Sequence, residues 1–277
     1  MFSDVTFDFS GRVAIVTGVG SPKGIGRAVL RGFADAGAHV AGCDIDDAQL
    51  TELKREQPDA FVKHVDVRDK RQVFDFVREV ATQYDHIDIL VNNAGIAPFC
   101  PLIDLAEATW DVTFDTNVKG YFLFAQTVAR HMIAQGQGGN IVNVTSVSVH
   151  ESGEHKAHYC ASKAAVGSLT KGLALELARY GIRVNAVEPG AVDTLIVKDA
   201  YLSELMDNLT KDPGTPINRL ADGRDMVGAV MFLCSEAANY MTGSSILVDG
   251  GGLAGSQMPQ HVRREYEKAK TNRIKQA

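Results

Sequence analysis

Residues 12–26 read RVAIVTGVGSPKGIG, and this stretch decides the fold. Arg12–Thr17 is a short run rich in β-branched residues, which predicts a buried strand. A turn with four glycines follows (Gly18, Gly20, Gly24 and Gly26), and the run from Arg27 to Leu30 opens a helix. A strand, a glycine-rich turn and a helix in this order predict the first unit of an alternating β/α fold.

The same alternation continues along the chain. Apolar runs rich in Val, Ile, Leu and Ala alternate with longer amphipathic stretches, and such runs are typical of parallel strands buried on both faces. The predicted strands are Arg12–Thr17, His39–Asp44, Phe61–Asp66, Ile87–Asn92, Asn140–Thr145, Arg183–Val187 and Ser245–Val248. The sequence therefore predicts an α/β fold with a doubly wound parallel sheet of about seven strands and helices on both faces.

One intervening stretch shows the helical pattern clearly. Lys70–Tyr84 carries apolar residues at Val73, Phe74, Val77 and Val80, which predicts a helix with one buried stripe.

The length of 277 residues suits one large domain, predicted here to span residues 1–255. Residues 256–277 form a charged tail, mainly basic from His261 to Gln276. A solvated terminal helix or a loose tail is the favoured interpretation, and an arm that docks on a neighbouring subunit is the alternative.

Composition excludes several classes of function. Hydrophobic residues make up 45% of the chain and the net charge is −6, which fits a globular protein without an electrostatic footprint for nucleic acid. No apolar run reaches the length of a membrane span, and the N-terminus lacks a secretory signal, so a cytoplasmic location is expected. The four cysteines (Cys43, Cys100, Cys160 and Cys234) and the eight histidines show no ligand spacing. We expect free thiols and no metal site.

The glycine turn predicts a phosphate site. Glycines let the backbone approach a pyrophosphate, while the following helix offers free N–H groups and the positive end of its dipole. The turn follows the first buried strand and opens a helix, which is the context that such a site requires. It is not a P-loop, since no Gly-Lys-Ser/Thr is present. We expect a dinucleotide here.

Asp44 ends the second predicted strand, 20 residues after Gly24. A carboxylate there bonds the adenosine ribose hydroxyls and repels a 2′-phosphate, so NAD (NADH) is the expected cofactor and NADP the less favoured one. A strand-end turn residue is the alternative interpretation, and Lys23 is a contrary signal because an ammonium attracts a 2′-phosphate. Asp66-Val67 is expected at the lip of the adenine pocket, or in a simple turn.

Tyr159 and Lys163 carry the predicted chemistry. A spacing of four places both on one face of a helix. An ammonium beside a phenol favours the phenolate, so the tyrosine pKa is expected to fall, and such a phenol exchanges a proton with an alcohol oxygen. Taken alone, the pair is equally a solvated surface feature.

With these motifs the chain resembles the short-chain dehydrogenase/reductase family over about residues 10–252. The ordered matches are the loop from Thr17 to Gly26, Asn92-Asn93-Ala94-Gly95, Asn117, Ser146, Tyr159 with Lys163, Pro189-Gly190 with Thr194, and Val248-Asp249-Gly250-Gly251. The resemblance implies a Rossmann-type fold and a dimeric or tetrameric homo-oligomer. One departure stands out: five residues, instead of the usual three, separate Gly18 from Gly24.

The resemblance also assigns roles to residues. It implies a catalytic set of Tyr159 as acid/base, Lys163, Ser146 on the substrate oxygen, and Asn117 in a proton relay through a water. Lys163 would also hold the nicotinamide ribose. The expected cofactor contacts are Gly18, Ser21, Gly24, Ile25, Gly26, Asp44, Asp66, Val67, Asn93, Ala94, Gly95, Tyr159, Lys163, Pro189, Gly190, Val192 and Thr194.

The substrate is predicted from the polar stretch His150–Lys156, which lies between Ser146 and Tyr159. If this stretch faces the pocket, it suits a polar secondary alcohol or ketone of the sugar, polyol or hydroxy acid type; a solvated loop is the equal alternative. The expected substrate contacts are Ser146, Ser148, Glu151, His155 and Tyr159, with an apolar wall of Phe99, Leu102 and Leu195. Leu195–Pro216 is expected to form a lid.

Three functions compete at this point. The first is an NAD-dependent oxidoreductase, and the second is an NADPH-dependent ketone reductase such as a 3-oxoacyl thioester reductase. The third is a non-catalytic Rossmann protein that senses nicotinamide. The complete set of Asn117, Ser146, Tyr159 and Lys163 argues against the third, because a sensor has no need of the phenol.

Overall fold

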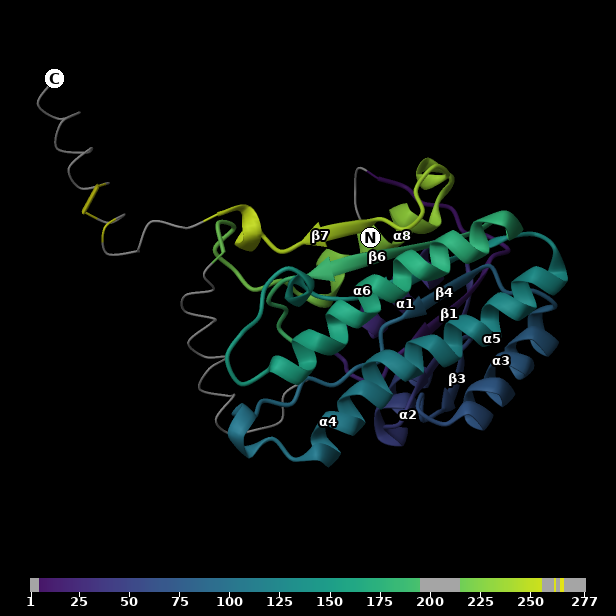
Figure 1. The fold of residues 1–277 in the computed structure, drawn as a ribbon. Helices are drawn as coiled ribbons and strands as arrows, with labels where there is room; N and C mark the ends of the chain where they lie inside the picture. Colours follow the sequence, from purple (N-terminus) through teal and green to yellow (C-terminus); the bar gives the residue numbers. More distant parts are fainter. Residues whose placement is uncertain (1–4, 195–214, 256–261, 263–264, 267–277) are drawn as a thin grey trace, which may run out of the picture.

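The computed structural model describes residues 5–194, 215–255, 262 and 265–266. Its centre is one parallel sheet with the strand order β3-β2-β1-β4-β5-β6-β7 (Figure 1). The strands are β1 Val13–Thr17, β2 His39–Asp44, β3 Phe61–His64, β4 Ile89–Asn92, β5 Gly139–Val144, β6 Ile182–Pro189 and β7 Ser245–Val248. The predicted doubly wound sheet is confirmed.

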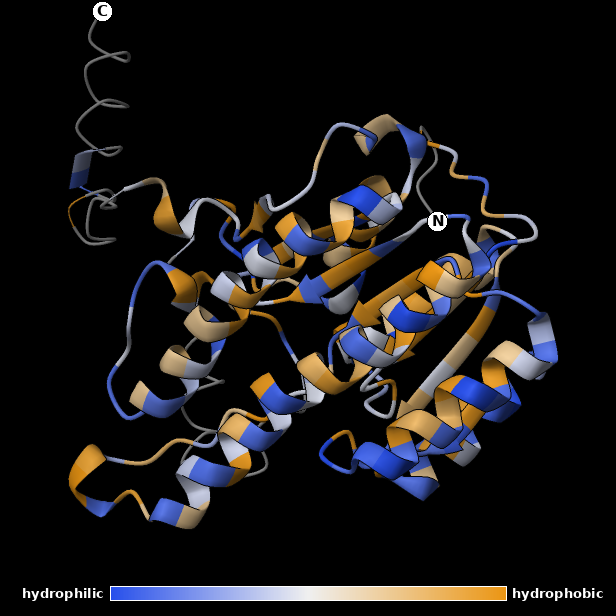
Figure 2. Cartoon of the chain, turned by 45° about the vertical axis from the view of Figure 1, so that its right-hand side comes forward, coloured by the Kyte–Doolittle hydropathy of each residue, from blue (hydrophilic) through white to orange (hydrophobic). Residues whose placement is uncertain are grey.

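The main helices are α1 Ile25–Asp35, α2 Asp47–Glu56, α3 Lys70–Tyr84, α4 Glu107–Phe114, α5 Gly120–Gln135, α6 Ala157–Leu177 and α8 Val227–Cys234. Two separate apolar clusters show which face of the sheet each helix covers. Residues of α1, α2 and α8 pack on Ala14 and Val16, whereas α3, α5 and α6 pack with Val13 and Ile15. Figure 2 shows largely apolar strands between helices whose faces alternate in hydropathy.

Five strands (β1, β3, β4, β5 and β6) differ from their predicted ranges by one or two residues at one or both bounds, and the cause is visible for the ends of β3 and β6. Val65 still donates its N–H to the carbonyl of Asp44 at 2.9 Å, but the N–H of Asp66 turns to the side chain of Gln72, so β3 ends before the predicted Asp66. β6 continues to Pro189 because β7 pairs with its last four residues. The end of β3 is thus set by a side chain of α3, and the end of β6 by its partner strand.

One residue of the predicted helix stripe was assigned wrongly. α3 spans Lys70–Tyr84 as predicted, but Phe74 is 53% exposed while Phe76 is fully buried. Val73, Phe76, Val77 and Val80 follow the i, i+3, i+4, i+7 pattern of one helix face. Phe74 lies about 100° away from Val73 on that helix, under the guanidinium of Arg78.

The strand order reverses between β1 and β4, which are neighbours in the sheet but not in the chain. The chain leaves β1 toward one face and β4 toward the other, so a crevice opens at the carboxyl ends of these two strands. The predicted site residues lie along this edge of the sheet.

Among the described residues, no helix has the length and apolar character of a membrane span. All four cysteines are free thiols. No group of three or more His, Cys, Asp or Glu side chains that would hold a metal ion is found in the described part of the chain.

Candidate active site

The glycine turn forms an open cradle at the start of α1. Gly24 is the N-cap of this helix and supplies no side-chain cap, so the first N–H groups stay available. A Cβ at Gly26 would collide with the carbonyl of Gly18, so only glycine allows this close approach. The hydroxyl of Ser21 is buried without a hydrogen-bond partner. Free N–H groups, an unpaired hydroxyl and a helix N-terminus fit a pyrophosphate.

Asn93 holds the two strand ends of the crevice together. Its side-chain nitrogen donates to the carbonyls of Thr17 at 2.9 Å and Gly18 at 3.0 Å. The hydroxyl of Thr17 in return accepts the N–H groups of Asn93 and Ala94. Asn92 is buried beneath them and donates to the side chain of Asn143 and the carbonyl of Tyr121. The crevice is therefore pre-formed.

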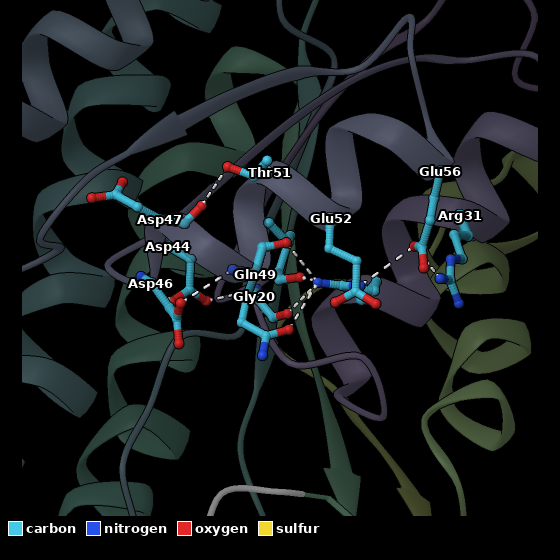
Figure 3. A network of polar contacts seen from close by, with 11 residues as sticks. Gly20, Arg31, Asp44, Asp46, Asp47, Gln49, Thr51, Glu52 and Glu56 are labelled. Atoms are coloured by element: carbon cyan, nitrogen blue, oxygen red, sulfur yellow. Dashed lines mark hydrogen bonds and ion pairs between the residues drawn. The ribbon is translucent and has the colours of Figure 1, made fainter.

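Asp44 is half-buried at the end of β2, and the lengthened glycine turn lies directly on it. The N–H of Gly20 donates to Oδ2 of Asp44 at 2.7 Å, and a Cβ at Gly20 would come within 2.7 Å of the carboxyl carbon. The other carboxylate oxygen accepts the N–H groups of Ile45 and Asp46. The N–H of Gly20, in the lengthened turn, thus helps to orient the carboxylate (Figure 3).

Lys23, whose ammonium could attract a 2′-phosphate, forms an ion pair with Asp193. Its ammonium lies 3.0 Å from the carboxylate of Asp193, which follows β6, and both side chains are about half exposed.

Asp66 forms a two-pronged pair with Arg68, whose hydrogen bonds lower the pKa of the carboxyl group. Val67 is buried against Gly120.

Lys163 is buried at 4% exposure on the face of α6 that carries Tyr159. Its ammonium donates to the carbonyl of Val144 at 2.8 Å and to the hydroxyl of Tyr121 at 3.4 Å, and lies 5.9 Å from the centre of the Tyr159 ring. Burial lowers the pKa of Lys163 to about 7. The amine therefore gains and loses a proton near neutral pH.

The expected fall in the Tyr159 pKa is not found. Burial raises the pKa of Tyr159, and a hydrogen bond with the hydroxyl of Ser146 only partly opposes this. Burial of the phenol therefore outweighs its hydrogen bond with Ser146, and burial likewise disfavours the charge on Lys163.

Ser146 follows β5 by two residues in extended conformation, and its hydroxyl accepts the N–H of Ser148 at 3.1 Å. That contact caps the short 3₁₀ turn Val147–Val149. The cap fixes the hydroxyl at the sheet edge, beside the phenol of Tyr159.

Asn117 lies in a π-helical turn, Asp115–Lys119, between α4 and α5. Its fully buried amide exchanges two hydrogen bonds with the backbone of Ile96 at 2.9 Å and donates to the hydroxyl of Ser162 at 3.0 Å. A Cβ on Gly95 would lie 3.2 Å from this amide oxygen and 3.7 Å from the nitrogen of Lys163. Asn117, Gly95 and Lys163 therefore converge, and π turns of this kind often mark functional sites.

The segment after β6 borders the same edge. Gly190 donates its N–H to Val248, Val192 bridges to Ala221, and Thr194 bonds the carbonyl of Val192. Leu195 and most of the expected lid, residues 195–214, lie outside the described residues, as does nearly all of the tail 256–277.

The expected substrate contacts occupy different environments. Ser148 is buried, whereas Glu151 and His155 are exposed. The carbonyl of His155 accepts the N–H of Cys100 at 2.7 Å, which ties this loop to the one after β4. Leu102 is 70% exposed and so does not form the expected apolar wall.

Sequence reasoning missed three residues that the structure singles out. Glu188, 4% exposed at the end of β6, pairs with His150 at 2.7 Å. Tyr121 is buried between Lys163 and Val144, and Arg27 is buried beneath the glycine turn. The available signal was a charged residue at a position where the pattern predicts an apolar one: Glu188 at the end of a strand, and Arg27 on the buried face of α1.

These residues form one arrangement along the carboxyl edge of the sheet. A cradle that fits a dinucleotide lies at β1 and β2, and a phenol, a hydroxyl and a buried amine lie at β5 and α6. Such a set is suited to moving a proton at an oxygen atom beside a bound nucleotide.

The comparisons with known proteins agree with this geometry. A family model described as Enoyl-(Acyl carrier protein) reductase matches residues 18–252. The chain is 38% identical over 250 residues to the NAD-dependent glycerol dehydrogenase of Listeria innocua, covering 90% of this chain and 96% of that protein. It is 37% identical over 246 residues to an L-rhamnose 1-dehydrogenase (NAD(P)(+)) of Sphingomonas, covering 87% and 96%.

A solved structure of a gluconate 5-dehydrogenase from Burkholderia cenocepacia, in complex with NADP and tartrate, superposes with a TM-score of 0.80. The two chains are 36% identical, and the match covers 90% of this chain and 98% of the other.

Proposed function

Because this chain belongs to the short-chain dehydrogenase/reductase family, we propose that it uses NAD(H) to interconvert a secondary alcohol and a ketone on a polar small molecule. It is an oxidoreductase that acts on CH–OH groups. The observation that carries the finer proposal is the meeting of Tyr159, Ser146 and Lys163 beside a crevice suited to a dinucleotide.

The proposed cofactor site uses the N-terminus of α1 and the hydroxyl of Ser21 for the pyrophosphate, and Asp44 for the adenosine ribose. Bound NAD supplies the hydride acceptor for the alcohol carbon. The Lys23–Asp193 pair supports NAD over NADP, because the ammonium is already matched by a carboxylate.

The proposed proton path begins at Tyr159. In the oxidative direction the phenolate of Tyr159 takes the proton of the substrate hydroxyl. The carbon that carries this hydroxyl loses its hydrogen as hydride. The hydroxyl of Ser146 donates to the substrate oxygen and holds it in place. Lys163, with its pKa near 7, passes the proton onward, and Asn117 fixes the loop of Ile96 beside it.

The proposed substrate is of the sugar, polyol or hydroxy acid type. The support is the polar loop 150–156 and the His150–Glu188 pair, which adds a fixed imidazole at the sheet edge. His150 ends the 3₁₀ turn that Ser146 begins, so the two residues lie within about 8 Å along the chain. Relatives named for glycerol, rhamnose and gluconate support the same class.

The test is a substrate and cofactor panel on the purified chain. We expect NADH absorbance to rise with at least one polyol, sugar or sugar acid, and more strongly with NAD than with NADP. The runner-up is an NADPH-dependent reductase of acyl thioesters, and the observation in its favour is the match to the family model described as Enoyl-(Acyl carrier protein) reductase. Turnover confined to 3-oxoacyl thioesters with NADPH would establish that alternative and refute the proposal.

A further inference from the structure

Arg27 is a charged side chain where the helix pattern calls for an apolar one. It lies on the buried face of α1 and is 0% exposed, whereas Arg31, one turn later, has a side chain that is 38% exposed. A guanidinium removed from water costs several kcal/mol unless its donors are satisfied in good geometry. The partners of Arg27 therefore indicate what the residue is for.

Most of those partners are backbone carbonyls at the cofactor end of the molecule. Nε donates to the carbonyl of Val19 at 3.2 Å, and Nη2 donates to the carbonyls of Gly20 and, at 2.8 Å, Gln49. Val19 and Gly20 belong to the lengthened glycine turn. Gln49 lies in the first turn of α2, close to Gly20 (Figure 3). One side chain thus joins α1, the turn and α2.

The charge of Arg27 is matched locally. Nη1 lies 3.4 Å from Glu56 and 3.5 Å from Glu52, and Glu56 also pairs with Arg31. Two arginines face two glutamates, so this cluster is neutral and presents no free cation to a phosphate. The role of Arg27 is therefore geometric rather than a long-range attraction.

Gly20 connects this cluster to the ribose carboxylate. Its carbonyl accepts from Arg27, and its N–H donates to Asp44 at 2.7 Å. The buried guanidinium therefore holds the carbonyl group of Gly20, while the N–H group of the same residue orients Asp44. Loss of Arg27 would leave the Gly20 carbonyl unpaired and the turn free to move off the carboxylate.

We propose that Arg27 is a positioning residue: through Gly20 it fixes Asp44 and so sets the preference for NAD over NADP, without touching the cofactor. This inference rests on the proposed role of Asp44 at the adenosine ribose. It also gives the two extra residues of the glycine turn a purpose, since the turn brings the Gly20 N–H onto the carboxylate.

The test measures nucleotide affinity directly, by NADH and NADPH fluorescence titration, in three test variants and one control variant. We expect Arg27→Met to weaken NADH about tenfold while NADPH changes less than threefold, so that the preference collapses. Arg27→Lys keeps the charge but offers a single ammonium in place of a fork, and should shift the preference in the same direction by less. Gly20→Ala disturbs Asp44 directly, because the added Cβ would collide with its carboxyl group. It should likewise weaken NADH binding more than NADPH binding.

Arg31→Met is the control, since Arg31 shares Glu56 but contacts neither the turn nor Asp44; both affinities should stay within twofold. If Arg27→Met does not fold, Arg27→Lys and Gly20→Ala decide the question by the same titrations. Wild-type affinities in those variants, or an equal loss for both nucleotides, would overturn the proposal. A wild-type protein that prefers NADPH refutes the proposed cofactor, and the shift in the ratio on changing Arg27 still decides its role.

Discussion

The two ends of the site hold their charged groups in opposite ways. At the nucleotide end, Arg27 is buried with matching glutamates and carbonyls, and Asp44 accepts three backbone N–H groups. At the catalytic end, Lys163 is buried with a carbonyl and a phenol but no carboxylate within ion-pair distance among the described residues. The first end uses charge to fix geometry, and the second leaves a charge destabilised so that its proton is mobile.

Removing the catalytic phenol should have the largest effect. We expect Tyr159→Phe to lower turnover by about 10²–10⁴-fold, because in the proposed mechanism this phenol takes the substrate proton. NADH affinity should stay within about threefold, since the nucleotide end is untouched. Steady-state rates and fluorescence titration measure the two quantities. Tyr180→Phe, at an exposed position, is the control; near-normal turnover in Tyr159→Phe would remove the proton role.

The mobile charge of Lys163 should appear as a pH-dependent stability. Because its folded pKa of about 7 lies below the ordinary 10.5, the unfolded chain binds more protons between these values. The free energy of unfolding is therefore lowered in full below pH 7, and it recovers as the pH rises toward 10.5. Relative to Lys163→Met, the wild type should gain on the order of 3–5 kcal/mol of unfolding free energy across that window.

Denaturant unfolding of both proteins at pH 7 and pH 10 measures this gain. Lys171→Met, at an exposed position on the same helix, should show no comparable pH dependence. A wild-type stability that falls relative to Lys163→Met as the pH rises would contradict the assigned shift.

At the nucleotide end, the expected effect is on cofactor choice. Asp44→Ala removes the carboxylate that we propose repels a 2′-phosphate, so the ratio of NADH to NADPH affinity should fall by about 10–100-fold, with each tenfold worth ~1.4 kcal/mol. Asp47→Asn, nearby but exposed, should leave the ratio unchanged. An unchanged ratio in Asp44→Ala would show that the carboxylate does not read the ribose.

The substrate side should respond more weakly. Glu188→Gln keeps the size of the side chain but weakens its hold on His150, and we expect KM for the polar substrate to rise about 3–10-fold, the worth of one hydrogen bond. The turnover number should change less than twofold. His64→Ala is a control at an exposed ion pair. A fall in turnover with constant KM would place the pair in the chemistry instead.

The smallest effect is expected at the surface. Lys23→Gln breaks an exposed pair with Asp193, and such pairs contribute about 0–1 kcal/mol. Affinities for NADH and NADPH should both stay within about twofold. A tenfold loss confined to NADPH would mean that Lys23 reads a 2′-phosphate after all.

Local pattern predicted the fold well because most of the parallel strands are short runs of apolar residues, and the first strand is followed by its own glycine turn. β2 and β7 match their predicted ranges, and α3 begins and ends where its pattern does. Phe74 was misassigned because a pattern of apolar residues contains two overlapping stripes, and only packing against α5 selects Phe76.

The site was predictable where it depends on side-chain type and not where it depends on partners distant in sequence. The spacing of Tyr159 and Lys163 is local, so their shared face follows from the sequence. The raised pKa of Tyr159 depends on burial by the whole fold, and the Glu188–His150 pair joins residues 38 positions apart. Arg27 similarly acts on a turn and a second helix that only the folded chain brings together.

The account depends most on the geometry between the phenol and the nucleotide, which a crystal structure with bound NADH measures directly. We predict the pyrophosphate at the N-terminus of α1 and the adenosine ribose on Asp44. The hydroxyl of Tyr159 should face nicotinamide C4, with room between them for a substrate oxygen at about 2.6–3.2 Å from the Tyr159 oxygen. A nicotinamide ring that binds away from residue 159, or a phenol that points elsewhere, would contradict it.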